Sequence, residues 1–242
     1  MAASKKDNKK KKSSYTNETK HSLDILIGDL HFHLKNEHQR QFWKLIDEKE
    51  IVICSGPAGV GKSMLSAAKA LELLKDPNSE YYKIIVCTPT IEVGGNSIGF
   101  LPGNIEDKLS PYNYSTIYLL EKLIGKSKVE TLMKEGYIEI MGLGFMRGIN
   151  IDNAIVIAEE FQNATHLEVK TLLTRIGYNS KFIVSGDLEQ SDKFKKLSDT
   201  GLHNAFHRLE NKGINEIGFF RFEQSDIVRN KLISKILDNY KD

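Results

Sequence analysis

The sequence predicts an α/β fold, in which a parallel sheet carries helices on both faces. Two observations lead to this class: short apolar runs alternate along the chain with segments of helical periodicity, and a glycine-rich turn follows the first run. The chain has 242 residues, of which 40% are hydrophobic and 27% are charged. Length and composition therefore fit one globular domain with a packed core, and the length is too small for two full domains of this kind.

Short apolar runs bounded by glycine or polar residues are typical of strands that are buried inside a parallel sheet. The segments between these runs have apolar residues at helical spacing and many good helix formers. We expect strands over residues 51–54, 83–87, 137–141, 154–158, 182–185 and 216–220. We expect helices over residues 32–46, 63–74, 117–124, 129–134, 165–176, 201–209 and 226–239.

Two segments carry more specific local predictions. Thr165 and Glu168 have the spacing of a capping box, so we expect the helix 165–176 to begin there. Residues 88–113 are rich in glycine, proline, asparagine and serine and are predicted to be irregular. An irregular stretch of this length is uncommon in a compact domain unless it is functional.

Residues 1–20 are polar and rich in lysine, and we predict a disordered tail that precedes a single domain over residues 21–242. The tail holds seven lysines, one aspartate and one glutamate, a charge of +5, which leaves −3 for the other residues out of a total of +2. So few apolar side chains do not offset the entropy lost on ordering. A basic tail either attracts nucleic-acid phosphates or only improves solubility, and the sequence leaves both open.

Several classes of protein are excluded by composition. No apolar run is long enough to cross a bilayer, and the polar N-terminus lacks the apolar core of a secretory signal. Cys54 and Cys87 each end an apolar run, which favours buried free thiols over a disulfide framework or a metal site. We therefore expect a cytoplasmic protein that has no membrane partner.

A phosphate-binding loop follows the first expected strand. Residues 56–63 read GPAGVGKS and match the pattern G-x-x-x-x-G-K-[ST] between a strand and a helix, which is the context that this loop requires. Its backbone N–H groups and the helix N-terminus bind phosphates, Lys62 reaches the β- and γ-phosphates, and the Ser63 hydroxyl ligates Mg²⁺. The fold class becomes a P-loop (RecA-like) NTPase, with ATP and Mg²⁺ as ligands. The residues expected to bind the nucleotide here are Gly56, Pro57, Ala58, Gly59, Val60, Gly61, Lys62, Ser63 and Met64.

Acidic residues follow the expected strand 154–158, where ligands bind in open α/β sheets. We assign Glu159 to the Mg²⁺ side, and Glu160 to the attacking water as general base. The alternative is a pair of solvated surface acids. After the expected strand 182–185, Asp187 is expected to link the nucleotide state to the rest of the protein, and Gln190 to donate its amide to the γ-phosphate.

With these strand ends, the chain resembles the PhoH-like family of P-loop ATPases, which is related to superfamily-one helicases. The resemblance extends from Asn36 to Tyr240, and the chain's size and lysine-rich start resemble bacteriophage members. The strings that carry it, besides the phosphate loop, are IGFLPG at 98–103, FMRG at 145–148, Glu160 with Gln162 and Asn163, LTRIG at 173–177, SGD at 185–187 with Gln190 and Asp192, and DIVR at 226–229.

The resemblance implies roles that spacing alone does not give. Gln39, three residues after Asn36, matches a glutamine that reads adenine; the alternative is an ordinary exposed helix residue. Arg229 matches an arginine near the γ-phosphate, in the style of an arginine finger; the alternative is a surface charge. Arg147 either contacts nucleic acid or a neighbouring subunit, or it caps a loop.

The resemblance also implies an ATPase that is coupled to RNA or single-stranded DNA and forms a homo-oligomer, a hexamer by analogy. If the chain is phage-encoded, its compartment is the host cytoplasm. Two departures affect the expected rate: Glu159 stands where most relatives have aspartate, and Thr88 precedes Pro89 without the arginine that relatives place between them. They motivate the alternative of a non-motor, ATP-dependent switch with little turnover. A third possibility, phosphate transfer to a small acceptor, lacks an evident acceptor pocket.

Overall fold

In the computed structural model of the chain, the described residues are 18–89, 105–190 and 193–228. Six parallel strands form one sheet in the order β3-β2-β4-β5-β1-β6. The strands β1, β4 and β5 are buried along their whole length, which explains why their sequences are almost continuously apolar. The strands are β1 (Ile51–Ser55), β2 (Lys83–Cys87), β3 (Ile138–Ile140), β4 (Ala154–Ala158), β5 (Lys181–Gly186) and β6 (Ile217–Arg221).

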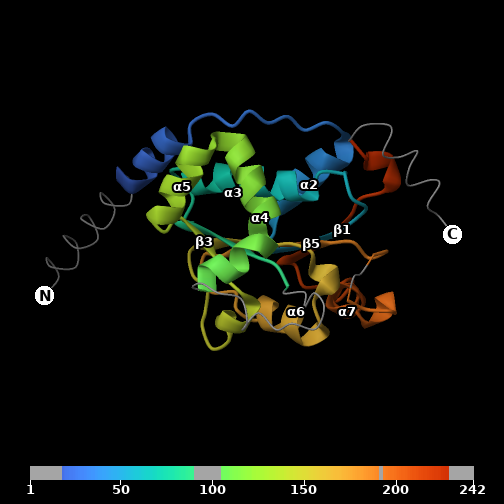
Figure 1. Cartoon of the computed structure of the whole chain (residues 1–242). Coiled ribbons are helices and arrows are strands. Elements are labelled where there is room, and N and C mark those ends of the chain that lie inside the picture. Colours follow the sequence, from blue (N-terminus) through green and yellow to red (C-terminus); the bar gives the residue numbers. More distant parts are fainter. Residues whose placement is uncertain (1–17, 90–104, 191–192, 229–242) are drawn as a thin grey trace, which may run out of the picture.

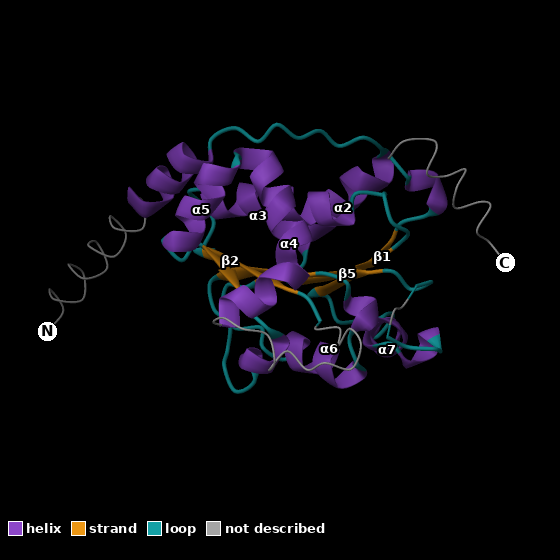
Figure 2. Ribbon diagram, in the orientation of Figure 1, coloured by secondary structure: helices purple, strands orange, loops and turns teal. Residues whose placement is uncertain are grey.

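Helices cover both faces of this sheet, as predicted (Figures 1 and 2). One face carries α2 (Glu37–Glu48), α3 (Lys62–Lys75), α4 (Ile105–Ile124) and α5 (Lys126–Lys134), together with a helix over residues 18–27. The opposite face carries α6 (His166–Leu173) and α7 (Gly201–Leu209). Each face has its own apolar core. Four short 3₁₀ helices complete the described chain: η3 (Leu143–Met146), η4 (Phe161–Asn163), η5 (Leu197–Asp199) and η6 (Gln224–Asp226).

The start of the ordered chain was predicted too late, because residues 18–20 already belong to a helix. Lys20 is buried, and its ammonium donates to the Leu74 carbonyl and the Ser79 hydroxyl, both at 2.8 Å, and to the Tyr81 carbonyl. These oxygens lie at and beyond the end of α3, where helix carbonyls lack partners and a cation is favourable. Burial nevertheless lowers the pKa of Lys20 to about 8. Residues 1–17 of the predicted tail lie outside the described part.

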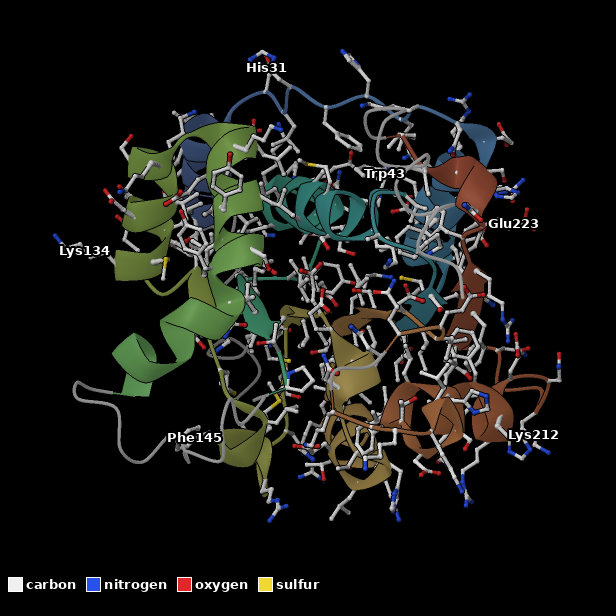
Figure 3. All side chains as sticks on the ribbon, turned by 45° about the vertical axis from the view of Figure 1, so that its right-hand side comes forward. His31, Trp43, Lys134, Phe145, Lys212 and Glu223 are labelled. Atoms are coloured by element: carbon white, nitrogen blue, oxygen red, sulfur yellow. The ribbon has the colours of Figure 1, made fainter. Side chains whose placement is uncertain are left out.

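The first predicted helix, 32–46, begins later than expected, at Glu37. Asn36 caps it, because its side-chain oxygen accepts from the Gln39 N–H at 2.8 Å. Residues 28–36 form an extended segment, here called the N-terminal strap, which passes over α3 toward α2 (Figure 1). Phe32 of the strap stacks on Trp43 with ring centroids 5.3 Å apart, and Figure 3 shows Trp43 beneath the segment that carries His31.

The predicted irregular stretch 88–113 was wrong over its last part, because α4 begins at Ile105 and continues through Pro111. Packing of the later turns of α4 on α3 and on the sheet stabilises a helix that local propensity alone did not indicate. Residues 90–104 lie outside the described part. The predicted last helix, 226–239, also lies mostly outside it, and residues 227–228 are not helical.

Both cysteines are free and buried, as predicted. Burial raises the pKa of the Cys54 thiol to about 12 and raises that of Cys87 still further above its usual range. Both thiols are therefore unreactive at neutral pH. Along the described part of the chain, no helix combines the length and the apolar character that a bilayer crossing requires.

The predicted capping box is present: the Glu168 N–H donates to the Thr165 hydroxyl at 3.2 Å, and the Glu168 carboxylate accepts from the Thr165 N–H at 2.7 Å. Replacing Thr165 with alanine is expected to lower the free energy of unfolding by about 1 kcal/mol, because an N-terminal donor loses its partner. Urea denaturation measures this change. The matched control is Thr131→Ala in α5, whose hydroxyl bonds only the Ser127 carbonyl of its own helix. Equal losses in the two variants would contradict the capping role.

Candidate nucleotide-binding site

The site lies where three neighbouring strands end. The register pairs Ser55 of β1 with Gly186 of β5, and Ala158 of β4 with Val184 of β5. The Gly56 N–H also donates to the Gly186 carbonyl at 3.3 Å, which ties the ends of β1 and β5 together. The phosphate loop and the two predicted polar strand ends therefore emerge side by side at the carboxyl edge of the sheet, which is where ligands bind in open α/β sheets.

Glycines give the phosphate loop its curled backbone. Gly59 and Gly61 have φ angles of 96° and 101°, in the left-handed region that favours glycine, and Gly61 is the N-cap of α3. A Cβ on Gly56 would lie 2.6 Å from the Phe222 Cβ, so glycine is also required at this close approach of two backbones. The Lys62 ammonium donates to the Gly56 carbonyl and, at 3.0 Å, to the Pro57 carbonyl, so it lies within the curl of the loop.

A cavity of about 520 Å³ opens above this loop. Most of the predicted site residues line it: Gln39, Ala58, Gly59, Gly61, Lys62, Ser63, Met64, Glu160 and Gln190. Gly56, Pro57, Val60 and Glu159 do not line it, and Val60 is fully buried. Arg229 lies outside the described residues, and Arg147 is exposed and is not among the lining residues.

Two of the elements that line the cavity were not predicted from the sequence. One is the N-terminal strap, which contributes Phe32, His33 and Lys35, and the other is α4, which contributes Ser115, Tyr118, Leu119 and Lys122. The spacing of the α4 residues, three and four apart, places them on one face of the helix. That spacing is visible in the sequence, but only the packing of α4 beside α3 brings the face to the phosphate loop.

Glu159 is buried, with 2% of its surface exposed, so the alternative of a solvated surface acid is wrong for this residue. The Thr116 hydroxyl of α4 donates to its Oε2 at 2.6 Å, and its Oε1 has no hydrogen-bond partner among the described residues. Burial raises the pKa of the Glu159 carboxyl, while the hydrogen bond from Thr116 and the nearby Ser63 hydroxyl oppose that rise. A carboxylate oxygen that is buried without a partner calls for a ligand.

Glu160 faces differently, although it is the next residue in the chain. Its backbone is in the left-handed region, with φ of 57°, which is uncommon for a residue other than glycine. This turn sends its exposed side chain to the cavity, while Glu159 points into the protein. Such backbone strain occurs often at functional sites.

A short chain of hydrogen bonds connects Glu160 to the end of β5. The Gln162 amide donates to the Glu160 Oε2 at 2.6 Å, and its Oε1 accepts from the Asp187 N–H at 3.1 Å. A Cβ on Gly186 would lie 2.6 Å from this same Oε1, so the bridge needs glycine there. Burial raises the pKa of the Asp187 carboxyl. The polar ends of β4 and β5 thus form one network, which was not predicted.

Gln39 is not the exposed helix residue of the alternative interpretation, because only 3% of its surface is accessible. Its Nε2 donates to the Val60 carbonyl at 2.8 Å, and its Oε1 accepts from the Lys35 N–H at 2.7 Å. The side chain therefore connects the phosphate loop to the N-terminal strap. One N–H and one lone pair of the amide are still available to a base in the cavity.

The end of the described chain is attached to the same region. Asp226 accepts from the Asn36 amide at 3.3 Å and lies 2.7 Å from the His38 Nδ1. The hydrogen bond to Asp226 and the charge of its carboxylate raise the pKa of His38. Two residues later, the Val228 N–H donates to the Gly59 carbonyl at 3.2 Å, and Val228 lines the cavity. The phosphate loop is thus held from outside by α2 and by the segment that precedes Arg229.

The family model for the PhoH-like protein matches residues 31–241. The chain belongs to this family. It is 39% identical over 207 residues to the PhoH-like protein of Bacillus subtilis, covering 86% of this chain and 63% of that relative. It is 36% identical over 208 residues to Protein PhoH of Escherichia coli, covering 85% of this chain and 57% of that relative. The chain therefore spans about three fifths of the length of the curated relatives that it matches.

Among solved structures, this PhoH-like chain is similar to the large terminase of a thermophilic bacteriophage. The TM-score is 0.51 at 12% identity, and the similarity covers 87% of this chain and 51% of the terminase chain. At this identity the similarity concerns the fold alone. The predicted family and the predicted fold class, a single P-loop NTPase domain with a parallel sheet, are both confirmed.

Replacing Gln39 with alanine is expected to weaken ATP binding by about tenfold, because the phosphate loop loses a buried hydrogen bond that holds its backbone. Titration calorimetry with ATP measures the affinity. Gln41→Ala, an exposed glutamine on the same helix, is the matched control and is expected to bind like wild type. Equal affinities for wild type and Gln39→Ala would show that this side chain supports neither the loop nor the nucleotide.

Proposed function

We propose that this PhoH-like chain binds ATP with Mg²⁺, hydrolyses it, and couples hydrolysis to RNA or single-stranded DNA. One observation carries the proposal: a phosphate loop, a buried acid and a cavity-facing acid lie together at three adjacent strand ends. Family membership and the P-loop fold support the ATPase part of this proposal. The coupling to nucleic acid rests on the helicase-like character that the family resemblance implies.

The residues present fit a triphosphate. The loop places the N-terminus of α3 and the Lys62 ammonium at one end of the cavity, where both attract phosphate oxygens. Gln39 lines the same cavity, and its amide would contact an adenine ring. Lys62 exchanges its bonds to the loop carbonyls for bonds to phosphate oxygens, which are the stronger acceptors for an ammonium group.

The residues also fit Mg²⁺. The Glu159 Oε1 has no partner among the described residues, and the Ser63 hydroxyl interacts with the same carboxyl group. Carboxylate and hydroxyl oxygens are the protein ligands that Mg²⁺ takes, with water and phosphate oxygens completing its shell. Glu159 and Ser63 would therefore hold the ion. When bound, Mg²⁺ supplies positive charge that neutralises the phosphates and the developing charge of the reaction.

Glu160 is placed to act as general base. Its carboxylate faces the cavity, and Gln162 fixes one of its oxygens at 2.6 Å, which leaves the other oxygen to accept a proton from the attacking water. Gln190 lines the same cavity and donates its amide to the γ-phosphate in this scheme. Asp187, connected to Glu160 through Gln162, would report the nucleotide state to β5 and beyond.

The proposed oligomeric state and compartment rest on the family resemblance rather than on these contacts. By the family resemblance, Arg229 would act near the γ-phosphate across a subunit interface, in the style of an arginine finger. We therefore propose a homo-oligomer, a hexamer by analogy, in the cytoplasm, or in the host cytoplasm if the chain is phage-encoded. The two buried thiols fit a reducing compartment.

A second candidate is a non-motor switch that binds ATP with little turnover. It is favoured by Glu159, whose side chain is one methylene longer than the usual aspartate and is fully committed to a buried position beside Thr116. Binding of ATP without hydrolysis, with or without nucleic acid, would support the switch over the ATPase.

Replacing Glu160 with glutamine is expected to lower kcat by about a hundredfold to ten thousandfold, since the general base is lost while the shape is kept. Phosphate release measures kcat, and fluorescent ATP measures binding, which is expected to persist. Glu189→Gln, an exposed acid next to Gln190 that does not line the cavity, is the control. If Glu160→Gln hydrolysed ATP at the wild-type rate, the assigned base would be wrong.

Removing Mg²⁺ with a chelator is expected to abolish hydrolysis, and Glu159→Gln is expected to raise the Mg²⁺ concentration for half-maximal activity at least about tenfold. The reason is that a neutral amide is a poorer ligand than a carboxylate. A titration of activity with Mg²⁺ at fixed ATP gives the value. An unchanged Mg²⁺ requirement in Glu159→Gln would remove this residue from the metal site.

A further inference from the structure

The outer face of α4 carries two exposed tyrosines that the core does not need. Tyr114 and Tyr118 are 64% and 51% exposed, and their ring centroids lie 6.2 Å apart with an interplanar angle of 24°. No other ring pair in the described part of the chain has both members more than half exposed. The opposite face of α4 supplies the buried packing, through Leu120 and Leu123.

These rings lie at the edge of the ATP cavity. Tyr118 lines the cavity together with Ser115 and Lys122 of the same helix. Tyr114 is one turn earlier and stacks against Tyr118, so the pair leads from the cavity outward along α4. Helix α4 therefore presents an aromatic row beside an exposed ammonium group.

We propose that Tyr114 and Tyr118 form a stacking platform for single-stranded nucleic acid, and that Lys122 binds its phosphate backbone. Exposed aromatic rings bind unpaired bases because every base has a π-face, and a nearby cation binds the backbone. The aromatic row on α4 is narrow and lies beside a serine and a lysine, which fits a single strand of nucleic acid better than a broad apolar protein interface. The proposal rests on the proposed coupling to nucleic acid and names the surface that would carry it.

The same helix connects this platform to the metal side of the site. Thr116 lies between the two tyrosines in sequence, on the buried face, and its hydroxyl bonds the Glu159 Oε2 at 2.6 Å. A nucleic-acid strand that stacks on the tyrosines and shifts α4 would therefore change the position of Thr116 relative to Glu159. Thr116 is thus a positioning residue, and α4 is the element through which a bound strand affects hydrolysis.

Fluorescence anisotropy with labelled oligo(U) and labelled oligo(dT) tests the platform in both nucleic acids. Tyr114→Ala and Tyr118→Ala are each expected to weaken binding by about tenfold, and the phenylalanine variants are expected to bind like wild type. Tyr178→Ala is the matched control, because Tyr178 is 85% exposed but lies outside the cavity, between α6 and β5. Lys122→Ala is expected to make the slope of log affinity against log salt shallower by about 0.7, while the tyrosine variants leave the slope unchanged.

The outcomes separate this proposal from the proposed function. If wild type binds an oligonucleotide and both alanine variants bind it equally well, the platform is wrong, while the binding of nucleic acid that the proposed function requires is kept. A raised KM for ATP in Tyr118→Ala, with unchanged oligonucleotide affinity, would assign that ring to the nucleotide instead. If wild type binds neither oligonucleotide, the coupling and the platform fail together.

The connection through α4 has its own readout. Thr116→Val is expected to keep oligonucleotide affinity but to lose the stimulation of ATP hydrolysis by the oligonucleotide, and Thr116→Ser is expected to restore it. Tyr114→Ala is expected to keep the basal rate and to need about tenfold more oligonucleotide for stimulation. Full stimulation of Thr116→Val would contradict a path through this hydroxyl.

Discussion

The parallel pairing of β1 with β5, and of β5 with β4, fixes where the functional groups lie. Because the three strands are buried, parallel and in register, their carboxyl ends lie at the same edge of the sheet. The polar residues that follow the strands therefore lie together at this edge. The curl of the loop sets the start of α3, and the left-handed turn at Glu160 separates two neighbouring acids into a buried one and an exposed one. In the proposed function, the buried Glu159 binds the metal, and the cavity-facing Glu160 accepts the proton.

Around this edge, distant segments hold the loop in place. Gln39 of α2 bonds the Val60 carbonyl, and Val228 bonds the Gly59 carbonyl. Asp226, bonded to Asn36, ties these two contacts to each other. At the far end of α3, the buried Lys20 anchors the helix that leads into the N-terminal strap. Helix α2 and the last described segment therefore meet on the phosphate loop, so changes in either of them reach the cavity through few hydrogen bonds.

Much of the fold and of the site follows from local sequence. The phosphate loop needs glycines at fixed spacing, a buried parallel strand needs an apolar run, and the Thr165 cap needs only Glu168 three residues later; each of these signals is complete within a few residues. The remaining features depend on contacts between distant segments. In the sequence alone Lys20 resembles part of a polar tail, and its acceptors are supplied by the end of α3. The helix α4 through Pro111 is stabilised by packing on α3, α5 and the sheet. Likewise, the buried orientation of Glu159 depends on Thr116, which lies 43 residues earlier in the sequence.

We propose that the residues at these strand ends hydrolyse ATP and that bound single-stranded nucleic acid raises the rate of hydrolysis. The most direct measurement is phosphate release from ATP by purified wild type and by Lys62→Ala, each with and without single-stranded RNA or DNA. We predict turnover by wild type that one of the strands raises, and turnover at background in Lys62→Ala under every condition. Equal rates in the two proteins, or ATP binding without turnover under any condition, would contradict the proposal.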